Sequence, residues 1–358
     1  MGATLENTRK YLAEAATAGA SSAGNVATLN RVILPVIRRV MPTVIANELV
    51  GVQPMTGPVG QIHTLRVRYA DGFDDVTAGE EALSPFKIGV GYSGGGSTDK
   101  ADTTSALEGQ AGKRLSIQIL KQTVEAKTRK LSARWTFEAA QDAQAQQGID
   151  VEAEIMAALA QEITAEIDQE IIGSLRTLAG SDDESFDQSA VSGTATFVGD
   201  EHAALSVLIN RVANLIAART RRGAGNYAVC SPQALTILQS ATTSAFARST
   251  EGSFEAPTNT KFVGTLNASM RVYVDAYAAD DTSVLVGYKG SSEADAPAFY
   301  CPYIPLMSSG VVLDPSTFEP VVGFLTRYGY VELTNTASSL GNAADYVSKI
   351  AVSNLSFV

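Results

Sequence analysis

The longest regular pattern of apolar and polar residues lies between positions 149 and 180 and predicts one long helix. Apolar side chains recur there every four positions, at Ile155, Leu159, Ile163, Ile167 and Ile171, and Met156, Ile172, Leu175 and Leu178 widen the stripe. This spacing gives a helix one continuous apolar face, which must be covered. Asp150 is a suitable N-cap and Gly180 a suitable C-terminal stop. At 1.5 Å per residue the helix would be about 45 Å long, so we expect it to join distant parts of the molecule.

Two stretches of strand-like polarity flank a long loop. Residues 61–69 alternate between apolar and polar side chains, and residues 113–137 are rich in β-branched residues with the same alternation. Both patterns predict strands. Residues 71–110 lie between them and hold a glycine-rich segment at 89–96. A loop this long in a compact domain is usually functional or disordered, so we expect a subunit that reaches toward a neighbour.

The rest of the chain predicts shorter elements. Helices are expected at 5–16, in kinked pieces within 32–50, at 138–147 before Gly148, at 203–222, and at 232–239 behind a Ser231 cap. A strand is expected at 226–230, further strands at 272–277, 283–288, 298–304 and 321–333 in a mixed sheet, and a terminal strand at 349–358. Residues 181–193 and 241–259 are polar and predict loops. The alternation of strands and helices after position 200 indicates a second domain.

Charge changes sign along the chain. Residues 1–70 carry net +4, residues 71–110 net −6 and residues 111–134 net +6. The segment 150–172 holds seven acidic residues and no basic one. The whole chain of 358 residues has a net charge of −11 and a pI near 4.8. This argues against a sequence-independent nucleic-acid binder, which needs clustered Lys and Arg.

Composition excludes several other classes of protein. With Cys230 and Cys301 as its only cysteines, the sequence has neither a disulfide framework nor a zinc set. Two buried free thiols are the simpler interpretation, and a single disulfide bond remains an alternative. The N-terminus lacks the apolar core of a signal peptide, and no apolar run approaches the roughly 18 residues of a membrane span. We therefore expect a protein that folds in a cytoplasm.

Candidate chemistry is sparse. His63 and His202 are the only histidines, one on a strand and one at the start of a predicted surface helix, and no GxSxG, HExxH or phosphate-loop motif is present. The glycines of 89–96 formally match GxGxxG, but no helix pattern follows them, so a loop tip is the better interpretation. The helix carboxylates lack the ExxH partner of a bundle di-metal site. We expect no catalytic, cofactor or metal site, and a solvated or partner-facing acidic helix surface.

Four stretches resemble the major capsid protein of T-even-like tailed bacteriophages. They are VIRRVMPTVIANELVGVQPMTGPVGQIHTLRVRY at 36–69, ARWTFEAAQDAQAQQGIDVEAEI at 133–155, TRRGAGNYAVCSP at 220–232, and FYCPYIPLMSS with EPVVGFLTRYGY at 299–309 and 319–330. The resemblance implies an α+β protein with the HK97-like capsid fold. It implies an N-terminal arm and anchor at 1–60, an extended loop at 61–134, a peripheral domain with the long helix at 135–200 and 334–358, and a mixed-sheet axial domain at 201–333. Shell formation without catalysis is the implied function.

The chain departs from that family in two respects. T-even members have a cleaved propeptide and an inserted domain, whereas only about sixty residues separate Arg68 from Lys130 here. Leu12, Ala13 and Glu14 resemble the recognition pattern of the maturation protease, but the leader would be short, and we expect no cleavage. An accessory or cement protein would then supply what the inserted domain does elsewhere.

The resemblance turns the charge pattern into a hypothesis about subunit contacts. In this fold the extended loop lies over a neighbour's peripheral domain, so we expect the acidic loop to meet a neighbour's basic arm and the basic return strand to face a neighbour's acidic helix. The candidate interface residues are Arg38, Arg39, Asp71, Asp74, Asp75, Glu80, Glu81, Lys113, Arg114, Lys127, Arg129, Lys130, Glu162, Glu166, Asp168 and Glu170.

The favoured function is therefore a capsid subunit of a tailed-phage head. It would form hexamers, with pentamers left open, around double-stranded DNA that it meets by non-specific proximity. A portal, a scaffold and a cement or decoration protein are the other expected partners, with assembly in the host cytoplasm and no membrane. An encapsulin-like compartment shell and a hydrolase on a mixed sheet are the alternatives.

Overall fold

The structure is a computed structural model that describes part of the chain. The described residues are 46–73, 76–82, 89–94, 101, 103–109, 111–148, 150–188, 198–241, 246–248, 261–267, 269–278, 283–292, 295–333 and 343–355. The helix predicted at 5–16 and the kinked pieces before position 46 lie outside them. The chain divides into one unit of Met1–Arg39 with Trp135–Glu154 and a larger unit of Val40–Arg134 with Ile155–Val358.

The described part of the smaller unit contains helix α5 (Phe137–Gln147). The side-chain oxygen of Thr136 accepts a hydrogen bond from the backbone N–H of Ala139, and Gly148 closes the helix with a φ of 66°. Only glycine adopts this left-handed conformation readily, which is why the helix ends there. The predicted helix and its glycine stop are confirmed.

The long helix is confirmed as α6 (Val151–Leu178). The Asp150 carboxylate accepts hydrogen bonds from the backbone N–H groups of Glu152 and Ala153, as an N-cap does. Its buried residues are Leu159, Ile163, Asp168, Ile171, Ile172 and Leu175. In the larger unit, Ile171 and Leu175 pack with Leu49 and Tyr227 in one cluster. The apolar stripe is therefore core.

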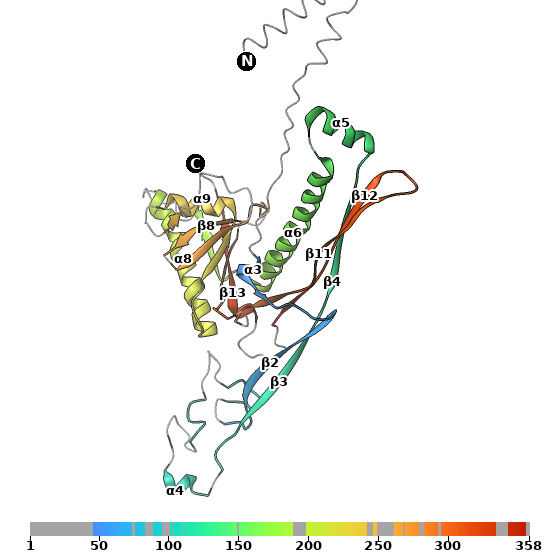
Figure 1. Ribbon diagram of the computed structural model, residues 1–358. Helices are drawn as coiled ribbons and strands as arrows, with labels where there is room; N and C mark the ends of the chain where they lie inside the picture. The colour runs from blue at the N-terminus through green and yellow to red at the C-terminus, as the bar shows by residue number, and fades with distance from the viewer. Residues whose placement is uncertain are drawn as a thin grey trace, which may run out of the picture. The chain divides into compact units, whose positions relative to one another are not determined.

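A seven-stranded mixed sheet carries the larger core (Figure 1). Its strand order is β5 (Glu184–Asp187), β13 (Val347–Ser353), β10 (Val284–Gly287), β6 (Tyr227–Cys230), β9 (Met270–Val274), β8 (Lys261–Leu266) and β7 (Phe246–Arg248). Pairs β5–β13 and β6–β9 are parallel, and the other pairs are antiparallel. Helices α8 (Val198–Thr220) and α9 (Pro232–Ser240) supply apolar side chains to the same core, and a short 3-10 helix, η1 (Ala343–Tyr346), precedes β13.

A second, four-stranded sheet corrects the predicted single mixed sheet. Its order is β1 (Gly51–Val52), β11 (Ala298–Leu313), β12 (Pro320–Glu332) and β4 (Lys127–Arg134). The strands predicted at 298–304 and 321–333 exist, but they pair with each other, and β12 also pairs with β4. An alternating sequence pattern predicts a strand but does not determine which strand it pairs with. Strands β11 and β12 are neighbours in the sequence and long enough to form their own antiparallel hairpin.

Strand β5 is a further correction, because residues 181–193 were predicted as a loop. Phe186 is buried in the core, and β5 runs parallel to β13. A single apolar residue among acids and serines gives no strand pattern, so only the pairing with β13 reveals it. The terminal strand is confirmed as β13, which lies inside the sheet between β5 and β10.

The strand predicted at 61–69 and the first part of the stretch predicted at 113–137 form a separate ribbon, whereas the second part of that stretch is β4 of the four-stranded sheet. β2 (Val59–Tyr69) pairs antiparallel with β3 (Leu115–Glu125) over their whole length, and no described strand pairs with either outer edge. Two short helices lie near this part of the chain in sequence, α3 (Ala46–Leu49) and α4 (Thr104–Leu107). The β2–β3 hairpin is the element on which the candidate site is built (Figure 1).

Candidate functional site: the hairpin and its charged neighbours

One face of the β2–β3 hairpin exposes a row of large apolar side chains. The register pairs Leu65 with Ile119, Val67 with Ile117 and Tyr69 with Leu115, and directly paired residues share a face. The exposed fractions are 67% for Leu65, 56% for Leu115, 67% for Ile117 and 59% for Ile119. We call these four residues the apolar strip. Contiguous exposed apolar surface of this kind marks an interaction site.

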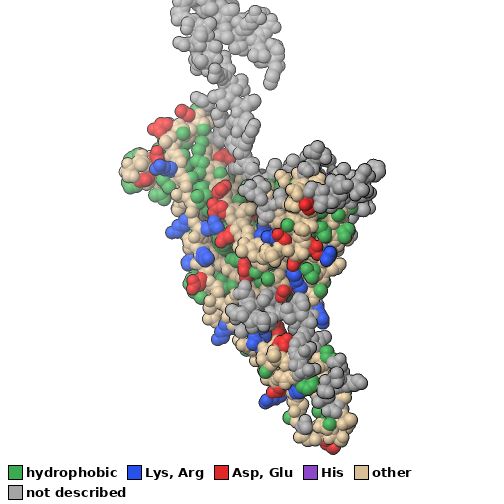
Figure 2. Space-filling model, turned by 180° about the vertical axis from the view of Figure 1, so that it is seen from behind, with side chains coloured by type: hydrophobic (Ala, Val, Ile, Leu, Met, Phe, Trp, Pro, Cys, Tyr) green, Lys and Arg blue, Asp and Glu red, His purple; other side chains and the backbone are tan. Residues whose placement is uncertain are grey.

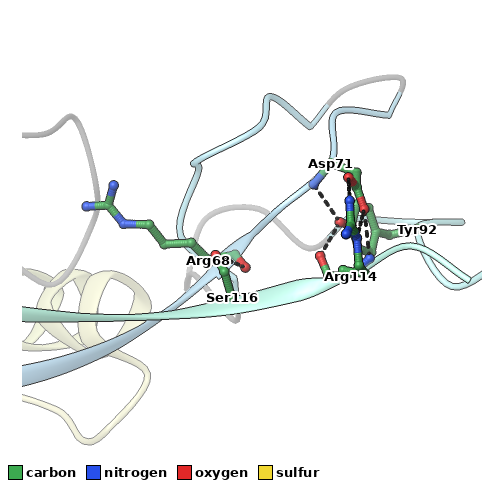
Figure 3. Close-up of polar contacts among 5 residues, drawn as sticks. All are labelled: Arg68, Asp71, Tyr92, Arg114 and Ser116. Carbon is green, nitrogen blue, oxygen red and sulfur yellow. Dashed lines mark hydrogen bonds and ion pairs between the residues drawn. The ribbon is translucent and has the colours of Figure 1, made fainter.

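The far end of the hairpin is held by polar contacts around Tyr92 (Figure 3). The Tyr92 hydroxyl donates a hydrogen bond of 2.7 Å to the Arg114 carbonyl and accepts one of 3.2 Å from the Asp71 backbone N–H. The Asp71 carboxylate accepts from the backbone and the guanidinium of Arg114, at 3.0 and 3.2 Å. The hydroxyl of Ser116 donates to the carbonyl of Arg68. These bonds join the ends of both strands to the loop.

A small apolar cluster lies beneath these contacts. Tyr69, Val76, Ala82 and Tyr92 are buried together, and the two tyrosine rings lie 4.5 Å apart. Outside the cluster, the Arg66 guanidinium pairs with the Glu81 carboxylate at 3.0 Å. The described part of the hairpin end is therefore a folded knob with its own core.

The charges at this end are mutually stabilised but exposed. The Arg114 guanidinium, by its hydrogen bond, lowers the pKa of the Asp71 carboxyl below its ordinary value, and the Asp71 carboxylate raises the pKa of Arg114. The ammonium of Lys113 lies over the ring of Phe73. Because water screens exposed pairs, these contacts set geometry more than stability.

A second charged cluster joins three elements of the larger unit. Arg129 of β4 donates to Glu166 and Glu170 of α6, at 2.5 and 2.6 Å, and to the hydroxyl of Tyr328 of β12 at 2.6 Å. The Tyr328 hydroxyl donates in turn to Glu170. Burial alone would raise the pKa of Glu170, but the hydrogen bonds from Tyr328 and Arg129 lower it overall. The cluster fixes the long helix to the four-stranded sheet.

Several charges expected to meet a neighbouring subunit thus have partners inside the chain. Asp71 pairs with Arg114, Glu81 with Arg66, and both Glu166 and Glu170 with Arg129. The basic return strand does face an acidic helix, but it is the helix of the same subunit. Spacing along the sequence could not distinguish the two arrangements, because it does not place β4 beside α6.

The remaining candidate residues divide into four groups. Lys127, Lys130 and Glu162 are exposed, and the Glu80 carboxylate accepts from the backbone and hydroxyl of Thr77. Asp168 is only 3% exposed, so the prediction of a solvated or partner-facing position is wrong for this residue. Its place in the helix, one turn from Ile171 and Ile172, puts it on the inward face. Arg38, Arg39, Asp74 and Asp75 lie outside the described residues.

The groups considered for catalysis do not converge. His63 is exposed on β2, whereas His202 is 4% exposed, which corrects its expected place on a surface helix. The His202 ring is hydrogen-bonded to the hydroxyl of Ser240 and lies beside Gln188. Cys230 and Cys301 are both free and buried, as the simpler interpretation expected. Within the described residues, no cluster of three or more His, Cys, Asp or Glu could hold a metal ion.

Sequence reasoning missed two parts of the site. The alternation of Leu65, Ile117 and Ile119 predicted strands, but nothing in the pattern showed that this face lacks a cover. Tyr92 was the one aromatic residue inside the glycine-rich segment 89–96, and that contrast was an available signal of a packed anchor. No helix among the described residues is long and apolar enough to cross a membrane.

Comparison with known proteins gives consistent matches. A family model described as "Major capsid protein Gp23" matches residues 26–110 and 90–352. The major capsid protein of Vibrio phage KVP40 is 30% identical, over 90% of this chain and 80% of its own, and that of Enterobacteria phage T4 is 30% identical, over 87% and 77%.

Solved structures show the same fold at low sequence identity. "Mycobacterium phage Bobi" matches with a TM-score of 0.55 and 14% identity, over 93% of this chain and 99% of that one. "The capsid of Myoviridae Phage XM1" matches with a TM-score of 0.51 and 10% identity, over 91% and 98%. Likeness at this level of identity bears on the fold alone, which is HK97-like.

Proposed function

Since the chain belongs to the Gp23 family of major capsid proteins, we propose that its β2–β3 hairpin holds neighbouring copies together in the phage head. The chain is a major capsid protein of a tailed phage, a component of the virion that assembles with other copies into a shell. The single observation that carries the proposal is the apolar strip. A two-stranded ribbon cannot cover this face by itself.

The free energy available in the strip is large enough to matter for assembly. Fully burying a Leu or Ile side chain contributes about 1.5–3 kcal/mol relative to leaving it exposed. More than half of each strip residue is exposed, so each hairpin retains a few kcal/mol that only a neighbour can realise. The folded knob lowers the entropic cost of docking, because Tyr69, Val76, Ala82 and Tyr92 are packed together before contact.

The test places charge on the strip. Ile117→Asp and Ile119→Asp replace exposed side chains, so the subunit should keep its thermal stability, whereas shells should fail to form because docking would bury an unpaired carboxylate. Light scattering and electron microscopy of the purified full chain measure assembly.

The matched control uses the opposite face of the same strand. Gln118→Asp introduces the same charge at a neighbouring exposed position and should assemble as the parent does. Normal shells from both strip variants would contradict the proposal. Equal failure of the strip variants and the control variant would mean that added charge, and not the strip, prevents assembly.

The family supports a wider proposal about partners. The copies form hexamers, and pentamers where the shell closes, around double-stranded DNA, with a portal, a scaffold and a cement protein as partners during assembly in the host cytoplasm. The chain acts without catalysis. The proposed domains are the arm at 1–60, the loop at 61–134, the peripheral domain at 135–200 with 334–358, and the axial domain at 201–333.

Charged residues extend the proposed contact between subunits. Arg38, Arg39, Lys113, Lys127, Lys130 and Glu162 remain the proposed charged contacts, together with Asp74, Asp75 and Glu80. Single exposed pairs contribute only about 0–1 kcal/mol, so their role is to set register and rate of association.

A further inference from the structure

The outer face of the four-stranded sheet contains an apolar hollow centred on Gly323. Arg129 and its partner Thr326 mark the face toward α6, so the next residues along each strand, Lys130 and Leu325, lie on the other face. The hollow has a volume of about 440 Å³ and is lined by Lys130, Leu131, Ser132, Met307, Ser308, Ser309, Gly323, Phe324 and Leu325. Because Gly323 has no side chain, the middle strand leaves room for one from elsewhere.

The hollow is flanked by positive charge. Lys130 and Ser132 are exposed on β4, and no carboxylate is among the lining residues. Arg134 lies further along the same face, with a side chain 69% exposed and 3.8 Å from Glu319. Figure 2 shows Lys and Arg side chains recurring along the side of the molecule on which β4 lies. An occupant of this hollow should combine an apolar side chain with carboxylates.

The chain itself contains a segment with that chemistry. Between Trp135 and Glu154 there are five acidic residues and no Lys or Arg. Phe137, at the first position of α5, is 44% exposed. Glu138 and Asp142 are both exposed and four positions apart, so they lie on one side of α5 next to Phe137. An exposed aromatic ring beside two carboxylates matches an apolar hollow beside an ammonium group.

We propose that the α5 segment of a second copy docks on this hollow, with Phe137 in the space over Gly323 and Glu138 and Asp142 near Lys130. The contact rests on the proposed shell assembly and is separate from the apolar strip. It gives each subunit a donor segment and a receptor face, so that contacts of this kind continue from copy to copy. Charge selects the partner, and the aromatic side chain fills the hollow.

The test changes the charge on each side of the contact in a separate variant and then mixes the two variants. The face variant carries Lys130→Glu with Ser132→Glu, and the helix variant carries Glu138→Lys with Asp142→Lys. At low ionic strength each variant alone should assemble about tenfold more slowly than the parent, because like charges then meet. An equal mixture should recover the parent rate, because the face of each variant then meets the oppositely charged helix of the other. At about 1 M salt the differences should shrink, since the screening length falls to about 3 Å.

Several outcomes would overturn the inference. Parent-like assembly of either variant alone would show that its charges do not take part. Slow assembly that mixing does not restore would show that the contact is not made between copies. Arg221→Glu also replaces an exposed basic residue by an acidic one, after α8 and away from the hollow, and it should assemble as the parent does. The Ile117→Asp variant is measured alongside to separate the two proposals. Normal assembly of this variant would contradict the hairpin proposal and would not bear on the proposed α5 contact.

A cross-link gives a second, independent readout. Copies with Ser132→Cys mixed with copies with Gln141→Cys, one turn after Phe137 in α5, should form a disulfide-linked dimer of the two variants on oxidation, and Cys230 and Cys301 are buried and should not compete. Gly323→Leu should fill the hollow and slow assembly without unfolding the subunit, since a Cβ there meets nothing closer than 3.5 Å. Gly323→Ala is the matched control. No mixed dimer, together with parent-like assembly of Gly323→Leu, would sink the proposal.

Discussion

Ile163 lies on the inward face of α6 with 2% of its surface exposed, and it tests whether that face is core. Ile163→Asp should destabilise the subunit by several kcal/mol, because a carboxylate would be buried without a partner. Denaturant unfolding of the purified subunit measures this, or soluble yield does if the variant does not fold. Ala158→Asp adds the same charge at an exposed position of the same helix and should change stability by less than about 0.5 kcal/mol. A stable Ile163→Asp subunit would contradict the structure.

Glu170 tests the Arg129 cluster through pH. Burial would raise its pKa, but the bonds from Tyr328 and Arg129 hold that pKa below the ordinary value of 4.5. A carboxylate with a lowered pKa contributes stability that is present above about pH 4.5 and is lost as pH falls through its folded pKa. Glu170→Gln should therefore lower the melting temperature at pH 7 and make it less sensitive to acid below pH 4.5. Glu162→Gln, at an exposed position of the same helix, should leave the melting temperature at pH 7 unchanged.

The hairpin behaves as an element with its own folded end. Tyr92→Phe removes the two hydrogen bonds that tie Asp71 and Arg114 together while it keeps the ring contact with Tyr69. The local opening free energy should fall by about 1–3 kcal/mol, because two partly buried backbone groups lose a partner. Hydrogen exchange of the Asp71 amide measures this opening. The exposed Tyr277→Phe serves as the control, and unchanged exchange in Tyr92→Phe would show that the knob is held by its apolar cluster alone.

At the scale of the whole molecule, deletion of part of the N-terminal arm tests whether the arm contributes to shell assembly and not to subunit folding. Removing residues 1–30 should leave the melting temperature of the subunit unchanged, because the described cores are built from residues after position 46. Shell stability should fall, since the arm is expected to reach beyond its own subunit. Electron microscopy and thermal melting of shells from full-length and shortened chains make the comparison. Equally stable shells from the shortened chain would show that these residues do not contribute.

The sequence by itself determined the elements whose signals are local. The stripe from Leu159 to Ile171 and the Asp150 cap specify α6, because helix periodicity and capping depend only on nearby residues. Alternation specified β2 and β3, and Ser231 with Pro232 specified α9. The family resemblance, carried by long uninterrupted stretches, indicated the fold class.

Only the tertiary structure decided which elements meet. Pairing of β4 with β12 brings Arg129 to Glu166 and Glu170, so charges that alternate along the sequence cancel within one subunit. Tertiary packing also buries the side chain of Asp168 and leaves those of Leu65 and Ile117 exposed. Partner choice depends on contacts between residues far apart in the chain, and neither periodicity nor charge order carries that information. The hollow over Gly323 exists only because three strands lie side by side.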